Sequence, residues 1–139
     1  MKPTMTPEQK ALALENLTEA RAILQDKDAW TKGTLKRRRM VKPSASDPLI
    51  SPPLYSYCAL GAINKADGPA RRVNAAKKVL AAAIKIMFPR RGGGSYASAS
   101  LRIMGFNDST RTKHEELLSV FDKAIEMAGS DAEIKNISL

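Results

Sequence analysis

Apolar side chains recur every three or four residues in three stretches of this 139-residue chain, at about 6–26, 69–87 and 112–128. This spacing places them along one face of an α-helix, whereas a half-buried strand needs strict alternation. We therefore predict three long amphipathic helices. Their apolar faces consist of Leu14, Leu17, Ala20, Ile23 and Leu24 in the first, Val73, Ala76, Leu80, Ala83, Ile84 and Met87 in the second, and Leu117, Leu118, Phe121, Ala124, Ile125 and Ala128 in the third.

Signals for helix starts and stops flank these stretches. The segment 6–9, Thr-Pro-Glu-Gln, combines a hydroxyl N-cap, a proline at the first helical position and a glutamine that can close a capping box. The segment 112–115, Thr-Lys-His-Glu, offers a second capping box, and Gly129 is a natural C-cap. We therefore expect the first and last helices to start shortly after Thr6 and Thr112.

Two further helices are expected from less regular patterns. Ser51-Pro52-Pro53 resembles a helix start, and the residues from Tyr57 to Ile63 are apolar on every side, as in a helix buried among others. We predict that this is the central helix, with Gly61 allowing close approach of a neighbouring helix. The apolar segment 97–104, which ends at Gly105, predicts one or two helical turns.

No stretch alternates as a half-buried strand does, so the expected fold is all-α. We predict a compact single-domain bundle, spanning residues 1–139, of four main helices and one short helix. Its ordered core covers about residues 6–129, and residues 130–139 form a flexible tail. A long basic loop at 31–50 connects the helix at 6–26 to the helix that is expected to begin at Ser51. This stretch is read as a loop because it has no period and contains glycine and two prolines.

The positive charge is concentrated in the middle of the chain. The whole sequence carries +9, but residues 29–104 hold 15 Lys+Arg and only 2 Asp+Glu, a balance of +13. Clustered cations attract phosphates, so these residues are the strongest functional signal. If the long loop folds beside the helix at 69–87, several of them share a face. The candidate binding residues are Lys32, Lys36, Arg37, Arg38, Arg39, Lys42, Arg71, Arg72, Lys78, Lys85, Arg90 and Arg91.

Composition excludes several classes of site. Cys58 is the only cysteine and His114 the only histidine, so no intramolecular disulfide and no common Cys/His zinc set can form. We expect no bound metal and no cofactor. No stretch approaches the roughly 18 apolar residues of a membrane span, and the N-terminus lacks the apolar core of a signal peptide. These features predict a cytoplasmic protein.

Only three residues could form a nucleophilic site, namely Cys58, His114 and Asp108. Such a site needs the thiol within hydrogen-bond reach of the imidazole, and the carboxylate must orient the ring. Cys58 lies in the most apolar segment of the chain, where burial raises a thiol pKa, so we favour a structural role for it. Asn107 and Asp108 are typical of a pair that closes a turn onto backbone amides. The alternative is a pocket shared with Arg111, Trp30 and Gly33.

Three motifs in order resemble a small bacterial and phage family catalogued as domain of unknown function 6197. They are Trp30-Thr31-Lys32-Gly33, then Tyr57-Cys58-Ala59-Leu60-Gly61-Ala62, then Phe106-Asn107-Asp108 followed by Arg111-Thr112. The resemblance covers about residues 8–128. This chain has Tyr57 and Phe106 where the family usually has tryptophan, which preserves an aromatic core role. The resemblance implies a phage, prophage or bacterial origin, and it implies no activity, substrate or cofactor.

These observations together predict a small basic accessory protein that is not an enzyme. We expect it to contact the nucleic-acid backbone through the basic loop and the basic face of the helix at 69–87. The alternative is a protein-interaction module, such as a phage protein that modulates a host complex, which would use the same basic face or the aromatic motifs. A cysteine-dependent enzyme is the third hypothesis.

Overall fold

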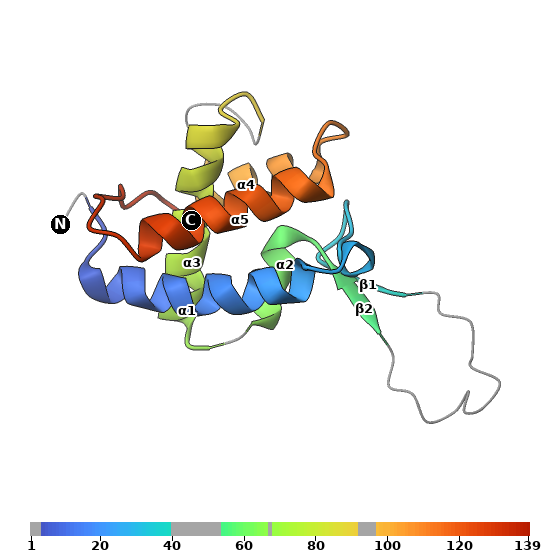
Figure 1. Cartoon of the computed structure of the whole chain (residues 1–139), viewed down its shortest axis with the longest axis horizontal. Helices are drawn as coiled ribbons and strands as arrows, with labels where there is room; N and C mark the ends of the chain where they lie inside the picture. Colours follow the sequence, from blue (N-terminus) through green and yellow to red (C-terminus); the bar gives the residue numbers. More distant parts are fainter. Residues whose placement is uncertain (1–3, 40–53, 67, 92–96) are drawn as a thin grey trace.

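The computed structural model is mostly helical and describes residues 4–39, 54–66, 68–91 and 97–139. Figure 1 shows the order of its elements along the chain. The described residues form α1 (Pro7–Leu24), the 3-10 helix η1 (Lys27–Ala29), β1 (Lys36–Arg38), β2 (Tyr55–Tyr57), α2 (Ala59–Lys65), α3 (Ala70–Met87), α4 (Ala99–Asp108) and α5 (His114–Ala128). The predicted helical fold is confirmed, with a small two-stranded sheet added to it.

The predicted capping box at the start of α1 is present. The Thr6 amide donates to Gln9 Oε1 at 2.8 Å, and the Gln9 amide donates back to Thr6 Oγ1 at 3.1 Å. Pro7 occupies the first helical position, where no intrahelical bond is lost. Local side-chain chemistry therefore sets this helix boundary where the sequence places it.

One contiguous core holds the helices together. The helix α1 packs against α3 and α5, and α3 also packs against α4 and α5. Figure 1 shows α1 and α5 running alongside each other while α3 crosses them. The largest fully buried side chains come from all three predicted amphipathic faces and from α4, and they include Leu17, Leu80, Ile103, Phe106 and Phe121. The helical periodicity thus predicted most of the core for the long helices, but Met87, assigned to the apolar face of α3, is exposed.

The second helix differs from its prediction. The expected long central helix is α2, which has only seven residues and begins at Ala59, after Cys58 as its N-cap. Residues Tyr55–Tyr57, predicted to be helical, form β2 instead. A short apolar run does not distinguish a strand from a buried helix by period, and tyrosine favours strands. The proposed helix start at Ser51 lies outside the described residues.

The strand that pairs with β2 comes from the predicted basic loop. In the antiparallel register Lys36 lies opposite Tyr57, Arg37 opposite Ser56, and Arg38 opposite Tyr55. We call these two strands the ribbon. It extends outward from the bundle at the end where α1 stops (Figure 1). The prediction that no strand forms is therefore wrong at this place, because the sheet depends on pairing between segments that local periodicity does not reveal.

Two helix boundaries, at the end of α4 and at the start of α5, also differ from the prediction. The helix α4 continues through Gly105 to Asp108, so Asn107 and Asp108 belong to its last turn rather than to a loop. The N-cap of α5 is Lys113, whose amide donates to Glu116 Oε1 at 2.9 Å. The predicted cap, Thr112, is buried instead. Gly129 caps the end of α5 as predicted.

The last ten residues, expected to be a loose tail, contact the bundle at several points, although most of them are exposed. Ile134 is 1% exposed, and its carbonyl accepts the Met5 amide at 2.8 Å. The carbonyl of Ser138 accepts the Ala99 amide at 2.8 Å, which satisfies a free donor at the start of α4. The prediction missed this segment because one buried isoleucine and backbone hydrogen bonds leave no periodic signal.

Candidate functional site

The side chain of Asn107 joins three separate segments of the chain. It is fully buried, and its Oδ1 accepts from Trp30 Nε1 at 2.7 Å and from the Ala59 amide at 2.9 Å. Its Nδ2 donates to the Thr31 carbonyl at 3.0 Å and to Asp108 Oδ1 at 2.9 Å. The side chain thus makes four hydrogen bonds, its full complement. We call Asn107 and these four partners the asparagine hub.

The hub corrects the sequence interpretation of the Asn107-Asp108 pair. The pair does not close a local turn, because its partners lie far away in sequence. Asp108 Oδ1 also accepts the amide of Gly33 at 2.9 Å. Gly33 has φ of +80°, a conformation that favours glycine over other residues. The association with Trp30 and Gly33, which the sequence suggested for a pocket, therefore occurs as a structural clamp.

Lys32 belongs to the same clamp and is not a free surface cation. Its Nζ donates to the carbonyls of Ser109 and Thr112, at 2.7 and 2.9 Å, just after the end of α4. The same ammonium lies 5.1 Å from the Trp30 ring centroid. Carbonyls at a helix end attract a positive charge, so this lysine serves the fold rather than a ligand.

Gly61 is explained by an extended segment and not, as predicted, by a neighbouring helix. A Cβ placed on Gly61 would lie 1.9 Å from the Leu35 carbonyl oxygen. That same oxygen accepts the Cys58 amide at 3.2 Å. The start of α2 therefore holds the chain immediately before β1, and only glycine leaves room for it.

The three catalytic candidates serve separate contacts in this fold. Cys58 Sγ accepts the Gly61 amide at 3.2 Å, and burial raises the pKa of this thiol, with a smaller contribution from the negative charge of Asp108. His114 Nε2 donates to the Leu24 carbonyl at 2.7 Å, and the ring lies beside Trp30. Among the described residues, no hydrogen bond joins Cys58, His114 and Asp108 to one another. These three residues therefore do not form an activated nucleophile.

Several of the predicted binding cations are held by other groups of the chain. Arg72 forms ion pairs with Glu19 at 2.7 Å and with Glu15 at 3.9 Å. Arg91 forms an ion pair with Glu116 at 2.9 Å. The hydrogen bond from Arg91 is the main reason why the pKa of Glu116 is lowered. These pairs reduce the positive charge that α3 and its C-terminal end present to solvent.

Two more cations are also engaged. Lys78 donates to Asn136 Oδ1 in the C-terminal segment. Arg39 donates from Nε to the Tyr55 carbonyl at 3.2 Å and lies 3.6 Å from Asp26. Lys42 lies outside the described residues. What remains of the predicted set is exposed and is found at two places. Lys36, Arg37 and Arg38 occupy β1, whereas Arg71, Lys85 and Arg90 lie on α3 or just after it.

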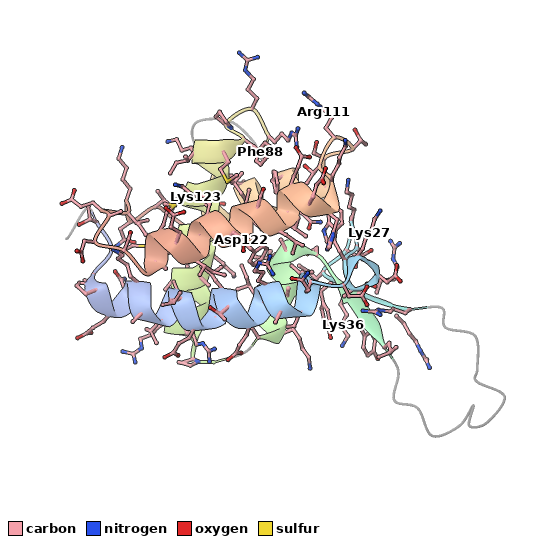
Figure 2. All side chains as sticks on the ribbon, in the orientation of Figure 1. Lys27, Lys36, Phe88, Arg111, Asp122 and Lys123 are labelled. Atoms are coloured by element: carbon pink, nitrogen blue, oxygen red, sulfur yellow. The ribbon has the colours of Figure 1, made fainter. Side chains whose placement is uncertain are left out.

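The sequence suggested that these two groups of cations could share one face of the molecule. In the structure they lie on different parts of it. The strand β2 packs beside η1 and α2, whereas α3 packs against α1, α4 and α5. Figure 2 shows Lys36 next to the ribbon, while Phe88, the residue that ends α3, lies well away from it. Arg71 and Lys85 are themselves about 21 Å apart along the helix axis. The ribbon is therefore the denser basic site.

Tyr55 is a site residue that the sequence analysis did not select. The Lys36 ammonium lies 4.1 Å from the centroid of the Tyr55 ring, close enough for a cation–π contact. Arg38 lies directly opposite Tyr55 in the register. The available signal was the Tyr-Ser-Tyr alternation at 55–57, which is typical of a strand with a single face of tyrosines.

The described part of the chain holds no group of three or more His, Cys, Asp or Glu side chains that could bind a metal ion. None of its helices is long and apolar enough to cross a lipid bilayer.

Comparison with known proteins gives one match. The model of a family described as "Family of unknown function (DUF6197)" matches residues 8–127. The matched span contains the ribbon and all members of the asparagine hub. No curated protein and no solved structure matches the chain.

Proposed function

The chain belongs to this family of unknown function, DUF6197, and we propose that it is a non-enzymatic accessory protein that binds the nucleic-acid backbone through its ribbon. The resemblance of its motifs implies a phage or bacterial origin, and the proposal is that it works in the cytoplasm of a bacterial cell. Function in this proposal depends on charge and shape, and the asparagine hub serves to hold the ribbon in place.

One observation carries the proposal. Lys36, Arg37 and Arg38 are three consecutive exposed residues on a strand that extends from the bundle. Among the residues that the structure describes, none of the three forms an ion pair, whereas Arg39, Arg72 and Arg91 all do. Cations without acidic partners can release the counterions of a phosphate backbone, which is the main source of sequence-independent affinity.

The ribbon is connected rigidly to the core, which supports the same proposal. The Leu35 carbonyl, one residue before β1, is held by the Cys58 amide at the start of α2. On the other strand, Ser56 Oγ donates to the Asp28 carbonyl at 2.5 Å. A ribbon with one bond to the core from each of its two strands presents its cations in a defined arrangement, so less conformational entropy is lost when a ligand binds.

An acidic host protein is the alternative partner for the same cations. An open strand edge invites a peptide to add as a further strand, but consecutive charged side chains on that edge oppose such pairing. Two of the three aromatic motif residues provide no surface either, because Phe106 is fully buried and Tyr57 is 9% exposed, while Trp30 is half-buried. We therefore favour nucleic acid over a protein partner.

A mobility-shift experiment with two matched variants tests the proposal. The ribbon variant is Lys36→Ala, Arg37→Ala, Arg38→Ala, and the helix variant is Arg71→Ala, Lys85→Ala, Arg90→Ala. Both remove one lysine and two arginines from exposed positions. We expect wild type and the helix variant to shift duplex DNA at low salt, and the ribbon variant to lose the shift. Absence of any shift by wild type at low salt would contradict the proposal.

The same experiment separates the two kinds of partner. Two competitors are compared, unlabelled DNA and polyglutamate, which serves as a model of an acidic protein surface. They are added at the same concentration of negative charge. If DNA displaces the labelled duplex and polyglutamate does not, the nucleic-acid assignment is supported. If wild type binds polyglutamate more tightly than DNA, the partner is an acidic protein and the proposal is wrong.

A further inference from the structure

We propose that the ribbon enters the major groove of B-form DNA with β1 leading, so that its cations reach phosphates on both sides of the groove. This inference rests on the proposed function and adds to it the form of nucleic acid and the groove.

The first argument is the distribution of charge over the two faces of the ribbon. Successive side chains of a strand point to opposite faces. Lys36 and Arg38 therefore lie on one face with Tyr55, whereas Arg37 lies on the other. All three are exposed. A single row of phosphates could be reached from one face only, but a groove is bounded by two rows, which cations on both faces can contact.

The second argument is the position of β1 at the outer side. The strand β1 is exposed at every residue, whereas Ser56 and Tyr57 of β2 are buried against the rest of the molecule. The described sheet contains only these two strands. The outer edge of β1 is therefore the part of the ribbon that reaches a groove first, and the bundle behind β2 limits how deeply it enters.

The thickness of the ribbon matches the width of one kind of nucleic-acid groove. Side chains on both faces give a strand layer a thickness of roughly 10 Å, which is the distance between stacked sheets. The major groove of B-form DNA is about 12 Å wide and its minor groove about 6 Å. The major groove of A-form RNA is deep and too narrow for side chains to enter. Of these grooves, only the major groove of B-form DNA accommodates the ribbon.

Tyr55 provides a further argument against a single-stranded target. Proteins that bind single strands without sequence preference stack bases on aromatic rings. One face of the Tyr55 ring is covered by the Lys36 ammonium, 4.1 Å from the ring centroid. The tyrosine thus orients a cation on its face of the ribbon, and the ring face that Lys36 covers is not free to stack on a base.

The test compares the affinity of wild-type protein for four ligands of equal length at low salt. They are a B-form DNA duplex, the RNA duplex of the same sequence, one DNA strand, and a DNA duplex whose major groove is filled by glucosylated 5-hydroxymethylcytosine. We expect the modified duplex and the RNA duplex to bind at least about tenfold more weakly than plain DNA, which equals about 1.4 kcal/mol. Netropsin, which fills the minor groove, should leave binding unchanged.

The outcomes distinguish the two levels of the proposal. If plain and glucosylated DNA bind equally, or if netropsin displaces the protein, the major-groove inference is wrong while the proposed function stands. The major-groove inference is also wrong if the RNA duplex or the single strand binds as tightly as the plain DNA duplex, or more tightly. If wild type binds none of the four ligands, the proposed function itself fails.

Single substitutions test the two-sided contact without relying on modified DNA. We expect Arg37→Ala and Arg38→Ala each to lower the salt dependence of binding by about 0.9 in log–log slope, the value of one phosphate contact. Arg37→Lys and Arg38→Lys should retain the slope of wild type. If one of the two alanine variants leaves the slope unchanged, only one face of the ribbon touches DNA and the inference is wrong.

Discussion

The indole nitrogen of Trp30 donates to the side-chain oxygen of Asn107 at 2.7 Å, although 77 residues separate them in the chain. The bond connects the segment that leads into β1 with the last turn of α4. Because Asn107 also holds the amide of Ala59, one buried amide positions both sides of the ribbon's base. The asparagine hub is thus the structural support for the proposed DNA-binding element.

Asn107→Ala should destabilise the fold strongly. The substitution leaves Trp30 Nε1, the Ala59 amide and the Thr31 carbonyl without their partner. Each buried polar group left unpaired costs about 1–3 kcal/mol, so we expect a loss of about 3 kcal/mol or more in the free energy of unfolding by urea. Thr110→Ala, at an exposed position nearby, is the control and should change stability by less than about 0.5 kcal/mol. Equal effects of the two substitutions would refute the role of the hub.

Gly61→Ala should destabilise the protein even though alanine favours helices. The added methyl group would lie 1.9 Å from the Leu35 carbonyl oxygen and must displace the segment before β1. We expect a cost of about 1–3 kcal/mol, typical of an overpacked site. Urea unfolding measures it, and hydrogen exchange of the Cys58 amide, which donates to that carbonyl, should become faster. A gain of about 1 kcal/mol, the value for an unconstrained helix glycine, would contradict the packing described.

Cys58 should react slowly with alkylating agents in the native protein. Burial raises the pKa of its thiol, so less of the reactive thiolate is present at neutral pH than in a free cysteine. Above about pH 8.5 the thiol of the unfolded chain loses its proton, whereas the Cys58 thiol of the folded protein keeps it. Stability should therefore fall, relative to Cys58→Ala, as pH rises beyond this value. Iodoacetamide labelling and urea unfolding at pH 7 and pH 10 test both points, and rapid native labelling would revive the cysteine-enzyme hypothesis.

Ile134→Ala should show that the C-terminal segment is part of the fold. Ile134 is 1% exposed and packs in the same core as the helices. Truncation of a buried isoleucine costs about 2–5 kcal/mol. The exposed Asp131→Ala is the control. Thermal unfolding followed by circular dichroism measures both, and a change no larger than that of the control would restore the expectation of a loose tail.

The long helices could be predicted because their information is local. The apolar spacing of α1, α3 and α5 and the capping box at Thr6 each act within a few residues of the chain. The motif residues Trp30, Gly33, Asn107 and Asp108 could be chosen from the sequence, and their association was one of its alternatives, but the hydrogen bonds that join them could not be predicted. Those contacts join α4 to a segment some 75 residues earlier, and no local pattern encodes such a pairing.

The sequence shows how many cations the candidate binding surface can draw on, but not how they are arranged. A count of charges finds the basic middle of the chain, but it does not show that Arg72 and Arg91 are paired with glutamates. Nor does it show that Lys32 caps the end of α4. The ribbon itself depends on pairing of Arg37 with Ser56 across the segment that separates the strands. Only the folded chain distinguishes exposed cations from those that the protein uses for itself.

The salt dependence of DNA binding by the two matched triple variants tests the central claim most directly. The slope of log Kobs against log salt concentration is measured for wild type, the ribbon variant and the helix variant on one B-form duplex. With three phosphate contacts on the ribbon, the ribbon variant should reduce the absolute slope by about 2.7, because each contact contributes about 0.9. The helix variant, with the same loss of charge, should leave it nearly unchanged. Equal reductions in the two variants would show that net charge alone attracts DNA, and the ribbon would then have no special role.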